Sequence, residues 1–395
     1  MAHSTGNTKR HSDAFCNLAS MNEQIGDYAT AQLQAFEAQR LARISANLYA
    51  EARALRIQAL CLKWFGDYSR SVSTLKRSMH LLGLCGLSGG RTYRDLMIEQ
   101  AEIHMLKSEY LEAYNIHVQN LKEMPADQGG YNRGYVLLNI AELGVHMGYS
   151  KDSVLRNLDA ARNIFETPER ILGLALCDAV LGHFHLHKGE FHEAKMIFER
   201  CIKLWMGKST EIIFYCLEQL GNVSCWPEKH SMSSWTVLFL ALSLKSTYRL
   251  GMYQALQFLG DIFLSYNDED TAVSLFTVAL EGFTAMDVHH SRAECMLRLG
   301  DIHKRCNDLL KAVGHWETAR PLFKRSSQAK QIVQIDERLA SVGKDVHQQH
   351  RENLVKLAEL KISSGISDEM EDDLEDKNKD LDAMKLVEPL ATYNL

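Results

Sequence analysis

Three short stretches of the sequence carry residue types that could do chemistry. In the first, LWMGKSTEI (204–212), Gly-Lys-Ser at 207–209 matches the end of a phosphate-binding loop. Such a loop needs an earlier glycine and a preceding buried strand, because its backbone must wrap around the phosphates. Ile202 occupies the position of that glycine, and FERCIKLWM before the motif has a helical pattern. The stretch therefore predicts a link between two helices, with Ser209 or Thr210 as a cap of the second.

The second stretch, GLSGG (86–90), fits the G-x-S-x-G pattern of serine hydrolases. That pattern works only on a sharp turn from a strand into a helix, where the serine hydroxyl is lifted toward an oxyanion hole. Here the glycines lie between two helical patterns, SVSTLKRSMHLL and RTYRDLMIEQ. We therefore interpret Ser88 as part of a flexible link, and the sequence predicts no catalytic residue and no enzyme.

The third stretch, GHFHLHKGEFHE, holds four histidines between residues 183 and 192. On a helix, His183 and His187 share one face, an arrangement that can bind zinc if further ligands come from elsewhere. The alternative is that these imidazoles are a polar lining of the helix, and a zinc titration separates the two. We favour the lining, so the sequence predicts no metal and no cofactor.

The composition favours a helical protein of a reducing compartment. Only five prolines occur in 395 residues, and proline is the residue that helix interiors tolerate least. The nine cysteines are scattered through apolar stretches without a Cys-x-x-Cys pair, so neither a zinc framework nor a disulfide framework is implied. We expect a cytoplasmic protein whose cysteines are small core residues.

The charge is concentrated at the C-terminus. Residues 363–395 hold ten acids and three lysines, a net charge of −7, so the rest of the chain sums to about +1 of the total of −6. A neutral body lacks the basic stripe that binds nucleic acid or anionic membranes. The apolar run 235–244 is half the length of the roughly 20 residues that span a bilayer. The acidic segment 366–395 cannot recover its ordering entropy by burial, and we expect it to be disordered.

A period of about forty residues runs through most of the chain. LGDIFLSYNDEDTAVSLFTVALEGF (259–283) aligns with LGDIHKRCNDLLKAVGHWETARPLF (299–323) at an offset of 40. A turn residue recurs at steps of 39 to 42, with one unit filling the double step between 189 and 267. The turn residues are Gly26, Gly66, Ser108, Gly148, Gly189, Asn267 and Asn307. The period predicts eight units, each with apolar residues at the spacing of two amphipathic helices.

Residue size also recurs within the units. Small residues occupy the positions where the two helices approach, and large residues would fill the adjoining gaps. The small ones are Ala31, Ala113, Ala194, Ala272 and Ala312 after the turn and Gly182, Gly221, Gly260 and Gly300 before it; the large ones are Phe198, Phe276 and Trp316.

This pattern resembles the tetratricopeptide repeat over residues 12–325. The resemblance implies an all-α protein, a right-handed α-solenoid of about eight helical hairpins. Residues 326–365 would form a pair of capping helices, because they continue the helical pattern past a break at Gly343 with a more polar second helix. Residues 1–11 are expected to be disordered, like the acidic tail.

The resemblance also implies a concave groove lined by fixed positions of each first helix. Carried over onto this sequence, these are Arg53, Arg56, Lys63, Trp64, Tyr135, Glu142, His146, His183, His187, Tyr215, Asn222, Trp226, Gln254, Gln257, Asp261, Glu294, Asp301, Lys304 and Arg305. One subclass of the family holds a C-terminal carboxylate with a Lys and an Asn. Here Asn222 has the matching position, but Glu218 replaces the Lys, so this sequence departs from that subclass.

The expected function is therefore binding of a partner peptide or helix in the groove. The C-terminal repeats look like those of fungal proteins that join tetratricopeptide repeats to a nucleotide-binding signalling domain, which leaves a sensing or oligomerisation arm as the alternative. A third possibility is that the acidic tail folds back onto the basic groove residues Arg53, Arg56 and Lys63 and occludes them.

Overall fold

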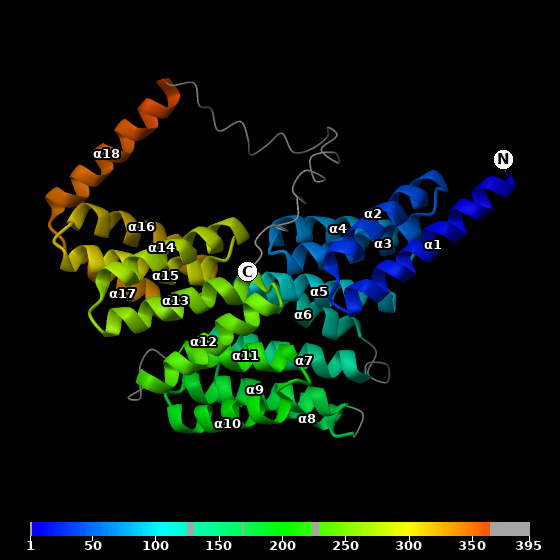
Figure 1. Ribbon diagram of the computed structural model, residues 1–395, viewed down its shortest axis with the longest axis horizontal. Helices are drawn as coiled ribbons and strands as arrows, with labels where there is room; N and C mark the ends of the chain where they lie inside the picture. Colours follow the sequence, from blue (N-terminus) through cyan, green and yellow to red (C-terminus); the bar gives the residue numbers. More distant parts are fainter. Residues whose placement is uncertain (1, 125–129, 168–169, 223–228, 364–395) are drawn as a thin grey trace, which may run out of the picture. The chain divides into compact units, whose positions relative to one another are not determined.

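Eighteen α-helices make up the regular structure of residues 2–124, 130–167, 170–222 and 229–363, the part of the chain that the computed structural model describes (Figure 1). The chain divides into two units, 1–341 and 342–395. The first unit contains α1 to α17, and the second contains α18 (Lys344–Ser363). The predicted all-α fold and its helical repeats are confirmed.

The first unit is built from eight helical hairpins, as the forty-residue period predicts. They are α1 (Ala2–Gln24) with α2 (Tyr28–Ile44), α3 (Leu48–Trp64) with α4 (Tyr68–Leu84), α5 (Arg91–Leu106) with α6 (Tyr110–Glu123), α7 (Gly130–His146) with α8 (Lys151–Phe165), α9 (Ile171–His187) with α10 (Phe191–Trp205), α11 (Thr210–Gly221) with α12 (Lys229–Lys245), α13 (Arg249–Ser265) with α14 (Glu269–Met286), and α15 (His289–Arg305) with α16 (Leu309–Arg325).

The turns within the hairpins share one backbone device. All seven predicted turn residues have positive φ, from 60° at Asn307 to 85° at Gly26, so each ends its helix in the left-handed conformation. In four hairpins an aspartate follows at once, and its side chain accepts a hydrogen bond from the third backbone N–H of the next helix, as Asp268 does from Thr271. The turn of the sixth hairpin lies partly in 223–228, outside the described residues.

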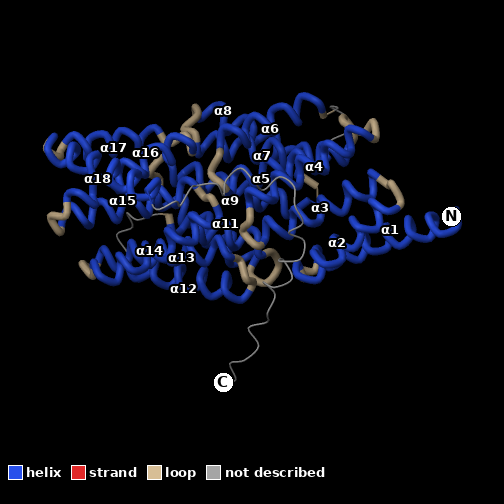
Figure 2. The backbone as a smooth tube through the Cα atoms, turned by 90° about the horizontal axis from the view of Figure 1, so that it is seen from above, coloured by secondary structure: helices blue, strands red, loops and turns tan. Residues whose placement is uncertain are grey.

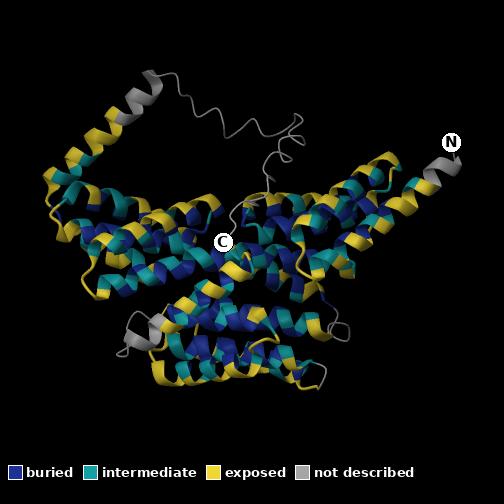
Figure 3. Ribbon diagram, in the orientation of Figure 1, coloured by how far each residue is buried: buried dark blue, intermediate teal, exposed yellow. Residues whose placement is uncertain are grey.

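The pairing of small with large residues is confirmed at the helix contacts. Phe198 and Trp316 are fully buried, and their rings lie directly against Gly182 and Gly300 of the preceding helix. A Cβ atom at Gly182 would lie 2.7 Å from the Phe198 ring, and one at Gly300 would lie 2.5 Å from Trp316 Nε1. Only glycine leaves room for these rings. Figure 3 colours the ribbon by burial and shows buried residues where helices face one another.

Hairpins far apart in the sequence also touch, whereas the repeats of an open solenoid contact only their neighbours. One apolar cluster joins Leu75 and Ile103 of the second and third hairpins to Phe276 and Leu299 of the seventh and eighth. A backbone hydrogen bond from His289 N–H to the Lys107 carbonyl joins the same hairpins. Figure 2 shows the described backbone as helices joined by short loops. The first unit is thus a solenoid that closes on itself.

The two ends of the first unit are formed by helices α1 and α17. Helix α1 begins at Ala2, whereas the sequence predicts that residues 1–11 are disordered. From Asn7 onward, Ser12 is the first buried residue, and the helix continues toward the N-terminus through local hydrogen bonds. Helix α17 (Ala329–Ala340) packs on α16 through the buried Ile335. The acidic segment 366–395 lies outside the described residues.

A candidate binding surface on the inner helices

Odd-numbered helices of successive hairpins lie against one another: α7 contacts α9, α9 contacts α11, and α11 contacts α13. These odd-numbered helices form a row. We call the side chains that α3, α5, α7, α9, α11 and α13 contribute to it, from Arg56 to Gln254, the inner surface. It holds most of the residues that the sequence placed in a groove. Four groups of side chains can be distinguished: paired charges, a row of aromatic rings, a central carboxyl near several tyrosines, and a histidine cluster.

The basic end of the predicted groove is already paired within the protein. Lys63 Nζ lies 2.9 Å from Glu102 Oε2, and Arg56 forms an ion pair with Glu99. Arg53 lies farther along α3, where its guanidinium donates a hydrogen bond of 2.8 Å to the Asn17 side chain and lies 3.8 Å from Asp13. These cations therefore tie neighbouring hairpins together, and an acidic partner would have to compete for them.

The C-terminal end shows the same pattern. Asp261 pairs with Arg298, which also contacts Glu294. The remaining predicted residues there bind neighbouring helices too: Asp301 binds Arg338, Lys304 donates to Ser341 Oγ, and Arg305 binds Glu269. Gln257 is buried, His187 and Asn222 are exposed, and Trp226 lies outside the described residues.

A continuous row of aromatic rings includes Trp64 and Phe214 of the inner surface. Trp64 stacks on Tyr28 with ring centroids 4.4 Å apart and lies 5.9 Å from Tyr248, which in turn stacks on Phe214 at 5.0 Å. These rings come from the first, second and sixth hairpins and the start of the seventh. They offer an apolar, π-rich surface of the kind that binds aliphatic stems and cationic groups.

Glu218 is the central feature that sequence reasoning did not place in the groove. Its carboxyl Oε1 accepts a hydrogen bond of 2.7 Å from Gln254 Nε2, and no Lys or Arg of the described ranges forms an ion pair with it. It acts electrostatically on four tyrosines, Tyr68, Tyr110, Tyr215 and Tyr248, which come from four different hairpins or their links. The signal for it was present: Glu218 stands where one subclass carries a Lys.

Burial changes the ionisation of the central carboxyls. It raises the pKa of Glu218 to about 7, against a smaller opposing effect of the Gln254 hydrogen bond. Burial and the nearby Glu218 raise the pKa of Glu142 to about 8. Both groups thus hold a proton near neutral pH to a larger extent than ordinary glutamates do, because burial disfavours their charged forms.

Replacing Glu218 by Gln should stabilise the protein at alkaline pH. The native state binds this proton more tightly than the unfolded state, so the carboxyl lowers stability as pH rises from about 4.5 through 7. We expect E218Q to gain about 1–3 kcal/mol at pH 8 and nothing near pH 4.5. Thermal midpoints between pH 4 and 8.5 measure this, with Glu193→Gln on the exposed side of α10 as a control that stays flat. An unchanged profile for E218Q would contradict the raised pKa.

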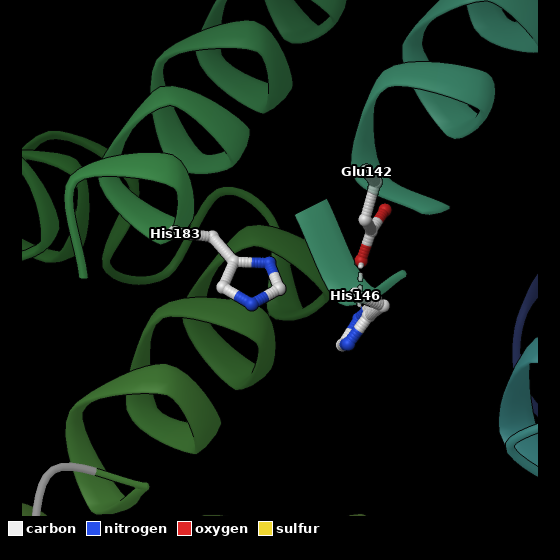
Figure 4. A group of neighbouring side chains, drawn as sticks. All are labelled: Glu142, His146 and His183. Carbon is white, nitrogen blue, oxygen red and sulfur yellow. Dashed lines mark ion pairs between the residues drawn. The ribbon is translucent and has the colours of Figure 1, made fainter. Parts of the chain in front are cut away.

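The histidines of α7 and α9 meet beside this carboxyl. His146 and His183 lie with ring centroids 4.6 Å apart, and Glu142 shares the α7 face with His146 (Figure 4). Burial lowers the pKa of His183 to about 3 and that of His146 well below its usual range, with neighbouring histidines adding to the effect. The predicted partner His187 is not part of this group.

The Gly-Lys-Ser motif (207–209) and the GLSGG motif (86–90) lie in links between hairpins, as predicted. Gly207 has a φ of 76° between α10 and α11, and Ser209 is the N-cap residue of α11, although its side chain makes no capping hydrogen bond. Ser88 lies between α4 and α5 at the edge of a shallow depression that His80 and Tyr93 also line. A helix precedes each motif where the corresponding chemistry requires a strand.

Within the described residues, no helix is long and apolar enough to cross a membrane. The tetratricopeptide repeat family model matches residues 179–204, which fall in the α9–α10 hairpin. A search of curated proteins finds no match.

Among solved structures, the chain is similar to a Rap protein in complex with competence and sporulation factor. The TM-score is 0.54 at 11% sequence identity, over 87% of this chain and 99% of the other. At this identity the likeness concerns the fold alone. The chain is thus a helical-repeat protein with a tetratricopeptide-type hairpin, similar in architecture to the Rap protein.

Proposed function

We propose that the first unit is a protein-interaction scaffold that captures a partner peptide or helix on its inner surface, with a Lys or Arg side chain of the partner placed at Glu218. The observation that carries this proposal is a half-buried carboxyl with one amide donor, four tyrosines within reach of its charge and no basic partner in the described chain. A carboxylate forms strong charge-assisted hydrogen bonds with ammonium or guanidinium groups, and aromatic faces attract the same cations.

Two further features support a peptide as the partner. The aromatic row of Trp64, Tyr248 and Phe214 offers apolar contact beside the carboxyl, which suits the stem of a long basic side chain. The similar Rap protein was crystallised as a complex with competence and sporulation factor, so a protein of this architecture forms a complex with a partner. Helical-repeat solenoids in general bind partners along such inner surfaces.

A direct test begins with a displayed library of random peptides selected on the full chain. We expect the selected peptides to share a Lys or Arg, and calorimetry with a Lys→norleucine version should show about a 10- to 100-fold weaker affinity, since a hydrogen bond to a charged group contributes about 1.5–3 kcal/mol. The variant E218Q should show the same loss, whereas Glu193→Gln should not. Affinity should also rise between pH 6 and 8, because the bound cation requires ionised Glu218.

Peptides without a common basic residue, or an affinity that E218Q leaves unchanged, would reject the cationic anchor. Selection of no peptide at all, under conditions in which the chain keeps its helical circular dichroism, would reject peptide capture itself.

The alternative roles use the same surface. A sensing arm of a larger fungal receptor rests on the resemblance of the C-terminal repeats alone, and a transcript that continues in frame into a nucleotide-binding domain would support it. Occlusion by the acidic tail is less favoured, because Arg53, Arg56 and Lys63 already have acidic partners within the first unit.

A further inference from the structure

We propose that Glu142, His146 and His183 bind a single divalent transition-metal ion of the zinc class. Each residue offers one ligand atom, and these atoms all lie within 4.8 Å of one another. Figure 4 shows Glu142 directed toward His146 and the His183 ring beside them. Imidazole nitrogens with one carboxylate oxygen are a ligand set that zinc-like ions take in proteins.

Small side-chain rotations would bring the three ligand atoms to the mutual distances of a metal-bound site. Glu142 Oε1 and His146 Nε2 are 4.0 Å apart. Ligands bonded to zinc at about 2.0–2.2 Å stand roughly 3.3–3.5 Å from one another in a tetrahedron, so each must move by about 1 Å or less. Glu142 and His146 are one helical turn apart on α7, and α7 packs directly on α9, so the backbone already holds the three groups in register.

Neighbouring side chains support the three ligands. The Tyr215 hydroxyl lies 3.2 Å from His183 Nδ1 and also hydrogen-bonds with Glu142, so α11 ties two of the ligands together. The Tyr110 ring stacks on His146 with centroids 4.3 Å apart and limits the rotation of that imidazole. Such supporting contacts fix ligand orientation in metal sites.

The site is reachable and leaves a coordination position open. The side chains of Glu142 and His146 remain 14% and 22% exposed on the inner surface, while His183 is buried behind them. Three protein ligands leave a fourth tetrahedral position for water or a ligand group, which is the arrangement of exchangeable zinc sites rather than closed structural ones.

The structure also separates this site from two other arrangements. His187, which shares a helix face with His183, is exposed and lies outside the group, so the ion would bridge α7 and α9 rather than sit on α9 alone. A second cluster, Glu109, Asp287 and His289, already holds Lys107, whose Nζ lies 3.0 Å and 2.9 Å from the two carboxylates. A cation of the protein itself therefore occupies the place of an ion there.

The test uses the full chain, stripped with a chelator and titrated with Zn²⁺ and with Co²⁺ as a spectroscopic probe. We expect one tight equivalent of Zn²⁺, and visible Co²⁺ absorption of tetrahedral intensity that Zn²⁺ displaces. His146→Asn and His183→Asn should each weaken Zn²⁺ binding by about 100-fold or more and abolish the Co²⁺ band. Glu142→Gln should weaken binding less, by about 10-fold or more. His187→Asn is the matched control and should leave both readouts unchanged.

Several outcomes would overturn the site. The proposed site is wrong if the wild-type protein binds no stoichiometric Zn²⁺. It is also wrong if the bound Co²⁺ has the weak absorption of an octahedral complex. Neither result requires a variant. Loss of binding in His187→Asn with retention in His146→Asn would assign the ion to α9 alone. Variants are compared only where their metal-free thermal midpoints match the wild type, and His146→Cys, which keeps a zinc ligand, should restore binding.

Discussion

Replacing Trp316 by Ala should lower the free energy of unfolding of the first unit by about 3–5 kcal/mol. The indole is fully buried, lies against Gly300 and donates a hydrogen bond of 3.2 Å from Nε1 to Asp301. Its removal leaves a large cavity between α15 and α16 and takes a donor from a carboxylate that also binds Arg338. Denaturant and thermal unfolding, followed by circular dichroism, measure the loss.

A double-mutant cycle with Gly300 tests the stated cause. Gly300→Ala alone should cost about 1–3 kcal/mol, because the new Cβ meets the indole at 2.5 Å. In the Trp316→Ala background the same methyl group enters the cavity and should be neutral or stabilising. Additive effects in the double variant would show that the two residues do not compete for one volume.

Replacing Glu109 by Gln should open the contact that closes the solenoid, at a cost of about 2–4 kcal/mol. We call Lys107, Glu109, Asp287 and His289 the clasp. Glu109 lies 3.0 Å from Lys107 Nζ and 3.1 Å from His289 Nε2, and the His289 backbone N–H donates to the Lys107 carbonyl at 3.0 Å. The amide loses the charge that holds these groups across hairpins far apart in the sequence.

The clasp also predicts a dependence on pH. Burial alone would raise the pKa of Glu109, but hydrogen bonds with His104, His289 and Lys107 outweigh it and hold the pKa well below its usual range. Its contribution is therefore present above about pH 4.5 and lost as the pH falls further. Hydrogen exchange of α5 and α15 should rise in E109Q at pH 7, while Glu112→Gln on α6 should resemble the wild type. Unchanged protection in E109Q would mean that apolar contacts alone close the solenoid.

The hairpins could be read from the sequence because their determinants are local. A positive φ at Gly189 or Asn267 and a small residue opposite Phe198 are needed wherever two helices turn back and pack closely. The same period carried a signal that the sequence analysis did not use. Ion pairs and hydrogen bonds between inner helices join residues about one repeat apart, as Lys63 with Glu102 and Gln254 with Glu218 do.

The histidine cluster and the clasp depend on the curvature of the solenoid, which local sequence patterns do not predict. Glu142 and His146 could be placed on one helix face, but their approach to His183 depends on the packing of two successive hairpins. The clasp joins Glu109 to His289, 180 residues away, and follows only from the accumulated rotation of the four intervening hairpins.

That separation has a consequence for biosynthesis. Helical repeats usually condense one after another as they emerge from the ribosome, because each needs only its predecessor. Here the second and third hairpins must wait for translation to reach residues 287–289 before Lys107 and Glu109 find their partners. Until then, the surfaces of these hairpins that later contact the seventh and eighth hairpins stay accessible to chaperones or to another nascent chain. Closure of the solenoid is therefore a late step of folding that depends on the length of chain already synthesised.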